Sequence, residues 1–152
     1  MKVALFLFIL SFNYTASNAR EMNNISRYSI ETKFSDSSKA VRLYNKGLLF
    51  NKNKDFKKAY QSFDRAIALN ANFAEAYLGR AVLKYKIASP FGMWDDFSMA
   101  IKLKPNFGEA YYERGLIKTF ISGKSLSANN DGETDFKKAT ELGFNRKSSN
   151  FR

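Results

Sequence analysis

The sequence contains one pattern of residues twice in the same register, and a third time with extra residues inserted. The three copies are Ala40 to Phe73, Ala74 to Phe107 and Gly108 to Phe144, and the two uninterrupted copies are each 34 positions long. This is the period of a repeat built from two helices and a turn. Arrays of such repeats work through an extended surface, which narrows the functions open to this chain.

Two features recur inside each copy and predict its helices. The eighth position is always small, and later in each copy an aromatic residue precedes an alanine by three positions. Apolar residues three and four apart share one stripe of a helix, so each copy is expected to form an antiparallel helix pair. A small residue lets two helices approach closely while a large neighbour fills the space. The small residues are Gly47, Ala81 and Gly115, and the aromatic residues are Phe63, Phe97 and Phe136.

Residues that stop helices stand where this arrangement needs them. The predicted breaks within the first two copies are Asn51 to Asp55 and Ser89 to Gly92, the second of which contains proline and glycine. Pro105 marks the stop between the second and third copies, and Gly143 is placed to cap the last helix.

With these residues the chain resembles the tetratricopeptide repeat family. Gly47, Ala59, Phe63 and Ala66 of the first copy match the family pattern, and the resemblance extends over Ala40 to Phe144. Departures are Ala71 in place of a proline, Met93 in place of an alanine, and the extra residues around Ser122 to Asp131. The resemblance implies an all-α fold, a right-handed superhelical array of antiparallel helix pairs, with three repeats at 40–73, 74–107 and 108–144.

The residues before the repeats indicate export. Lys2 precedes an apolar run from Val3 to Phe12, and the small residues that end at Ala19 suit a signal peptidase. We predict a signal peptide over 1–19 and a periplasmic or secreted mature chain. The apolar run is about half of the ~20 residues that span a bilayer, so retention as a membrane anchor is the weaker alternative. The chain contains no cysteine, which rules out a disulfide or a cysteine-linked lipid.

Two segments flank the predicted repeat domain, which covers 39–144. Residues 20–38 are polar and weakly periodic and predict a flexible lead segment, whose last residues, Ser35 to Ser38, could cap the first helix. Residues 145–152 form a short basic tail that is expected to fray.

The net charge of +11 is high for a chain of 152 residues. It would favour acidic partners, anionic polymers or an anionic membrane surface. The lysines are nevertheless spread along the whole chain, whereas a nucleic-acid-binding protein concentrates them on one face. No nucleic-acid partner is therefore expected. A basic, envelope-associated binder of anionic polymers or lipid head groups remains the alternative function.

The chain offers few groups for catalysis. It has no histidine and no cysteine, which removes the commonest general base, the thiol nucleophile and most transition-metal ligands. The adjacent Asp95 and Asp96 are explained as a solvated helix surface. Asp131, Glu133 and Asp135 lack the full oxygen pattern of a calcium loop. We therefore predict no enzyme activity, no cofactor and no metal site.

The family resemblance implies that the first helix of each repeat lines a concave groove that binds a peptide or partner segment. The implied groove combines aromatic and aliphatic residues with two glutamates at one edge and two lysines, Lys52 and Lys86, at the other. Tyr44, Tyr85 and Tyr112 are expected to be exposed contact residues. The candidate site residues are Tyr44, Leu48, Asn51, Glu75, Leu78, Val82, Tyr85, Glu109, Tyr112, Leu116 and Thr119. The alternative is that many of them belong to the core between helices.

One subclass of the family grips the carboxylate end of an acidic chaperone tail with lysine, asparagine and arginine. At those groove positions this chain has Tyr44, Leu48, Gly79, Glu109 and Glu113. None matches, and two carry the opposite charge, so capture of an acidic chaperone tail is not expected.

The last helix pair has no further helix-length segment after it in the sequence. Apolar residues such as Phe136 and Leu142 would then be left for self-association. Alternatively, Phe144 and Phe151 fold back over this surface.

Overall fold

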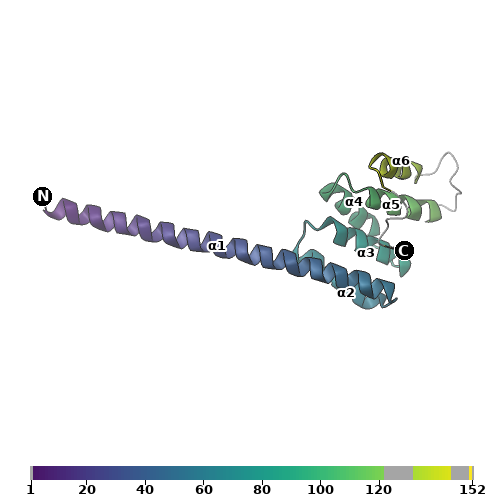
Figure 1. The fold of residues 1–152 in the computed structure, drawn as a ribbon, viewed down its shortest axis with the longest axis horizontal. Helices are drawn as coiled ribbons and strands as arrows, with labels where there is room; N and C mark the ends of the chain where they lie inside the picture. The colour runs from purple at the N-terminus through teal and green to yellow at the C-terminus, as the bar shows by residue number, and fades with distance from the viewer. Residues whose placement is uncertain (1, 122–131, 145–150, 152) are drawn as a thin grey trace. The chain divides into compact units, whose positions relative to one another are not determined.

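The computed structural model describes the backbone of residues 2–121, 132–144 and 151, and the side chains of these residues from 22 onward. The described residues form helices and turns and contain no strand (Figure 1). The chain divides into two compact units, residues 1–38 and residues 39–152. The helices are α1 (Lys2–Lys52), α2 (Phe56–Leu69), α3 (Ala74–Lys86), α4 (Met93–Leu103), α5 (Gly108–Ile121) and α6 (Glu133–Glu141).

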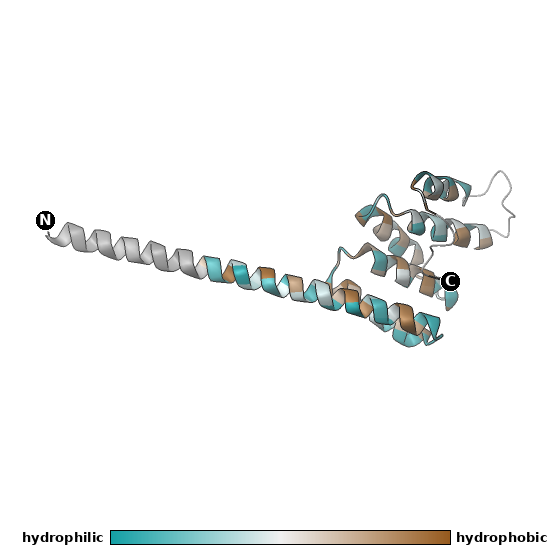
Figure 2. Ribbon diagram, in the orientation of Figure 1, coloured by the Kyte–Doolittle hydropathy of each residue, from teal (hydrophilic) through white to brown (hydrophobic). Residues whose placement is uncertain are grey.

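The unit of residues 1–38 is helical from Lys2 onward, whereas a flexible lead segment was predicted for 20–38. Among residues 22–38 the large apolar side chains, including Ile25 and Phe34, are exposed, and Figure 2 shows polar and apolar residues interleaved along this part of the helix. Hydrogen bonds within the helix satisfy its backbone without a packed face. The predicted cap at Ser35 to Ser38 is wrong, because these residues lie in the interior of α1. Within the part of the chain that the structure describes, no helix has the length and apolar character to cross a bilayer.

The unit of residues 39–152 contains three helix pairs with the predicted breaks. The first pair is the α1 segment from Lys39 with α2, the second is α3 with α4, and the third is α5 with α6. Asp55 is the N-cap of α2 and accepts a hydrogen bond from the Lys58 amide. Gly92, with φ of 64°, precedes α4, and α4 ends at Leu103 before Pro105. The helix breaks were therefore predicted correctly from proline, glycine and asparagine positions.

Gly143 ends α6 as predicted. Its φ is 73°, a left-handed conformation that glycine adopts without strain. The amide of Phe144 donates to the Ala139 carbonyl and the amide of Gly143 to the Thr140 carbonyl, both at 2.9 Å. These two hydrogen bonds satisfy backbone carbonyls of the last turn that have no partner within the helix. The insertion at Ser122 to Asp131 and residues 145–150 lie outside the described residues, as does Asp131 of the rejected calcium loop.

The first and second helix pairs share one aromatic ring. Phe63 of α2 is fully buried. A Cβ atom added to Gly47 would lie 2.5 Å from the Phe63 ring, and a Cβ atom added to Gly79 would lie 2.9 Å from it. No Cβ atom is tolerated at 2.5 Å, so the ring fills the space that the two glycines leave. The predicted packing of a large residue against small ones is thus confirmed, and it joins α2 to helices of both pairs.

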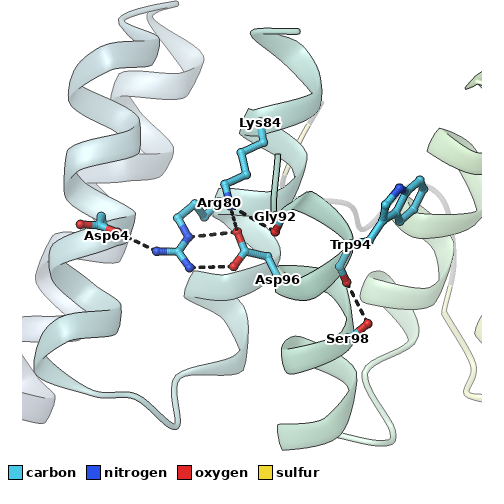
Figure 3. A network of polar contacts seen from close by, with 7 residues as sticks. All are labelled: Asp64, Arg80, Lys84, Gly92, Trp94, Asp96 and Ser98. Atoms are coloured by element: carbon cyan, nitrogen blue, oxygen red, sulfur yellow. Dashed lines mark hydrogen bonds and ion pairs between the residues drawn. The ribbon is translucent and has the colours of Figure 1, made fainter. Parts of the chain in front are cut away.

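A buried ion cluster joins the helices of the second pair (Figure 3). Both oxygens of Asp96 in α4 accept hydrogen bonds from the Arg80 guanidinium of α3, at 2.7 and 3.0 Å. Lys84 Nζ lies 2.8 Å from Asp96 Oδ2. Arg80 also pairs with Asp64 of α2 at 2.6 Å. Burial alone would lower the pKa of Arg80, but the bonds to Asp96 and Asp64 outweigh it and raise that pKa.

The prediction of a solvated surface at Asp96 is therefore wrong. Asp96 is 4% exposed, and its charge is neutralised by the two cations of α3. The third pair repeats the arrangement, since Asp135 of α6 binds Arg114 of α5 at 2.6 and 2.9 Å and lies 3.1 Å from Lys118.

Candidate functional site

The groove positions predicted on α1, α3 and α5 fall into two groups by exposure. Of the candidate site residues, Leu116 is exposed, and Leu48, Glu75, Tyr85, Tyr112 and Thr119 are half-buried. The edge lysines, Lys52 and Lys86, and Phe120, which follows Thr119, are also exposed. The other candidate residues are buried, namely Tyr44, Asn51, Leu78, Val82 and Glu109. Leu78 and Val82 belong to one apolar core cluster and Tyr44 to another, so the alternative of core residues holds for these three.

Tyr44 is buried, and its prediction as an exposed contact residue is wrong. Its ring packs against Phe63 at 5.8 Å and Phe73 at 5.2 Å between ring centres. Burial raises the pKa of Tyr44, and the nearby carboxylates of Glu109 and Glu75 raise it further. Tyr44 therefore contributes a neutral phenol close to two acidic side chains and serves packing first.

Tyr85 and Tyr112 are each half-buried but face different neighbours. Tyr112 lies against Phe136 and Phe144, with ring centres 5.6 and 5.3 Å away. This covers part of the apolar surface of the last helix pair, as the alternative for Phe144 predicted. Tyr85 makes an edge contact with the exposed Phe120 of α5 at 5.8 Å. Tyr85 and Phe120 thus present aromatic edges from two first helices.

A polar group lies among the ends of the first helices. Lys86 Nζ donates a hydrogen bond to the Asn51 side-chain oxygen at 3.5 Å. The Lys86 ammonium also interacts electrostatically with the Glu113 carboxylate. Burial lowers the pKa of Lys86, and Glu113 opposes that effect. We call the surface formed by Leu48, Asn51, Leu78, Val82, Tyr85, Lys86 and Glu113 the inner surface.

Phe151 lies on the inner surface. It is 6% exposed and belongs to the apolar cluster that includes Leu78 and Val82, against which Leu48 and Tyr85 also pack. Its backbone carbonyl accepts a hydrogen bond from Lys86 Nζ at 3.0 Å. The expectation that Phe151 folds back over the last helix pair is met at α5 but not at α6, because its cluster contains residues of α3, α4 and α5 and none of α6.

Acidic side chains flank the inner surface. Glu109 and Glu113 of α5 are buried, whereas Glu75 of α3 is partly exposed and pairs with Lys104 at 2.7 Å. Sequence reasoning identified Glu75 and Glu109 from their repeat positions. Glu113 stood out only as a groove position at which this chain departs from the carboxylate-gripping subclass.

The inner surface is suited to hold an aromatic side chain and its backbone. It offers an apolar cluster for the ring and the Lys86 ammonium for a carbonyl. Among the described residues, no group of three or more acidic side chains is placed to hold a metal ion.

Helix pairs joined through shared aromatic and glycine contacts define a helical repeat protein. The family model described as tetratricopeptide repeat matches residues 40–73. The chain therefore contains a tetratricopeptide repeat, and the resemblance to that family inferred from its sequence is confirmed.

Solved structures of tetratricopeptide-repeat domains have the same fold. The second such domain of Spaghetti (RPAP3), bound to the HSP90 peptide SRMEEVD, is 23% identical to this chain in sequence and superposes with a TM-score of 0.63. The match covers 74% of this chain and 98% of the Spaghetti domain. The OM64 domain of Arabidopsis is 22% identical with a TM-score of 0.61, covering 70% and 84%. MamA is 25% identical with a TM-score of 0.58, covering 70% and 60%. No curated protein matches the chain in sequence.

Proposed function

We propose that the chain is a non-catalytic adaptor that binds a protein segment on its inner surface. The observation that carries this proposal is the aromatic pair of the half-buried Tyr85 and the exposed Phe120 beside an apolar cluster with a polar hydrogen-bond donor, Lys86. Aromatic residues of this kind concentrate binding energy at protein interfaces. A similar fold that binds a peptide, in the Spaghetti domain, supports the same use of this one.

The class of bound segment differs from that of the Spaghetti domain. Its peptide, SRMEEVD, is acidic. The corresponding positions of this chain include Glu109 and Glu113, both buried, and a second negative charge brought next to them would be repelled. We therefore expect the synthetic peptide SRMEEVD to show no binding at concentrations where a true partner saturates the site.

Capture of partners from the native cell fraction tests the adaptor function. Phe120→Ser removes an exposed aromatic ring from the inner side, and Phe91→Ser removes one from the turn between α3 and α4, where 92% of the side chain is exposed. Phe120→Ser is expected to lose the bound protein and Phe91→Ser to retain it. Equal retention by both variants would remove the proposed surface.

Salt distinguishes the basic alternative function. Binding to anionic polymers or lipid head groups weakens steeply as ionic strength rises, because it depends on exposed charges. Binding through buried aromatic contacts is expected to persist at about 0.5 M salt, where the Debye length is only a few ångströms.

Export remains part of the proposal. A charged start and a short apolar run support a signal peptide ending at Ala19. The mass of the chain purified from the cell envelope checks this, since a protein retaining residues 1–19 would contradict cleavage.

A further inference from the structure

Phe151 lies where a bound segment is expected, and this identifies the chemistry of the partner. The ring is buried in the cluster of Leu78 and Val82, and the carbonyl is bonded to Lys86. These are the positions that the family resemblance assigns to the groove wall. The chain thus carries an example of an occupant for its own binding surface.

The sequence around Phe151 is basic. Residues 145–152 include Arg146, Lys147 and Arg152 and no acidic residue. Two buried carboxylates lie on α5, Glu113 on the inner surface close to Lys86 and Glu109 near Tyr44. Charges of opposite sign across an interface favour the correct partner and reject acidic competitors.

We propose that the inner surface selects a partner segment in which a phenylalanine is flanked by basic residues, and that Phe151 occupies this position until such a segment displaces it. This inference rests on the adaptor function proposed above. The aromatic ring enters the cluster of α3, α4 and α5, its carbonyl accepts from Lys86, and the basic flanks lie near the glutamates of α5. An occupant in the same chain lowers the apparent affinity for any partner by the fraction of molecules in which the site is free.

The test uses the full chain and one synthetic probe, a fluorescent peptide with the sequence of residues 145–152. Phe151→Ala empties the ring position, so this variant is expected to bind the peptide about tenfold more tightly than the unaltered chain. Phe91→Ala, a change of the same size at an exposed ring, is expected to leave the affinity unchanged. Equal affinity of the unaltered chain and Phe151→Ala would overturn the role of Phe151 as occupant.

Variant peptides test the chemistry of selection. A peptide with alanine in place of the phenylalanine is expected to lose binding to Phe151→Ala, and so is one with glutamate in place of all three basic residues. Binding of the alanine peptide as strong as that of the original would overturn aromatic selection. Binding of the glutamate peptide as strong as the original would overturn selection by charge.

A second variant keeps the proposal testable if Phe151→Ala folds poorly. The chain has one tryptophan, Trp94, so the double variant Trp94→Phe with Phe151→Trp reports on position 151 alone. Its emission is expected to be that of a buried indole and to shift to the red when unlabelled peptide is added in excess. Emission typical of a water-exposed indole from the start would overturn the inference.

The same variants test whether Phe151 binds within its own chain and whether this inference can fail independently of the adaptor function. Light scattering is expected to show a monomer for both the unaltered chain and Phe151→Ala. A dimer that dissociates on Phe151→Ala would place the ring in a second copy and overturn occupancy within one chain. If Phe120→Ser abolishes partner capture while Phe151→Ala does not change peptide binding, the adaptor function stands and this inference fails.

Discussion

The first and second helix pairs are held together by different means. In the first pair, α2 places Phe63 against Gly47, and the residue that corresponds to Asp96 is Ser62, whose hydroxyl donates to the Lys58 carbonyl within its own helix. In the second pair, Asp96 binds Arg80 and Lys84 across the two helices. The first pair, whose sequence matches the family model, therefore depends on shape, and the second adds buried charge.

This difference shows how a repeat tolerates divergence. Lys46 and Phe50 stand in the first pair where Arg80 and Lys84 stand in the second, so the first pair has one cation at these positions instead of two. Ser62 needs neither, because its hydroxyl donates within its own helix. Each pair thus keeps the same aromatic and alanine pattern, while the polar contacts between its two helices differ from those of the other pair.

The largest expected effect is on the shared ring. Phe63→Ala should lower the free energy of unfolding by about 4 kcal/mol, because it leaves a cavity between the first and second pairs. Urea unfolding monitored by circular dichroism measures this loss. Phe91→Ala is the matched control and should change stability by no more than about 0.5 kcal/mol. A small loss for Phe63→Ala would show that the first pair does not depend on this packing.

The ion clusters of the second and third pairs should differ in the cost of losing their carboxylate. Asp96→Ala leaves Arg80 and Lys84 at 17% and 11% side-chain exposure, whereas Asp135→Ala leaves the more exposed Arg114 and Lys118, at 22% and 28%. Buried charge that loses a partner is costly. Arg80 would keep the exposed Asp64, while Lys84 would lose its carboxylate. We therefore expect losses of about 3 kcal/mol for Asp96→Ala and about 2 kcal/mol for Asp135→Ala. Thermal unfolding of both variants compares them. The reverse order would contradict burial as the deciding factor.

The smallest effect is expected at the start of α2, and it depends on pH. The side chain and amide of Lys58 hold the pKa of Asp55 below its ordinary value. The stabilisation is therefore present at neutral pH and is lost as the pH falls through the folded-state pKa. Asp55→Ala should melt slightly below the unaltered chain at about pH 7, and the difference should shrink below about pH 4. A difference that stays constant with pH would assign the cap to another group.

Much of the fold was predictable because its signals are local. The helix breaks follow from Pro105, Gly92 and Gly143, whose backbone requirements do not depend on distant residues. The contact of Phe63 with Gly47 followed from the recurrence of small and aromatic residues at fixed positions.

The candidate site was predicted less well because it depends on contacts between distant segments. Periodicity placed Asp96 on a helix but could not show that Arg80, sixteen residues earlier, would neutralise it. The repeat position of Tyr44 predicted an exposed ring, but Phe63 and Phe73 pack against it. Phe151 follows a segment with no periodic signal, and only the folded chain brings it to Lys86.

The sharing of Phe63 between two helix pairs has a consequence for how the array opens. Withdrawing this ring uncovers Gly47 and Gly79 together, and Arg80 adds a second link through Asp64. In repeat proteins, such links between neighbours decide whether units unfold singly or as a block. Amide protons of α2 and α3 are therefore expected to exchange with solvent as one cooperative unit, with one common protection factor.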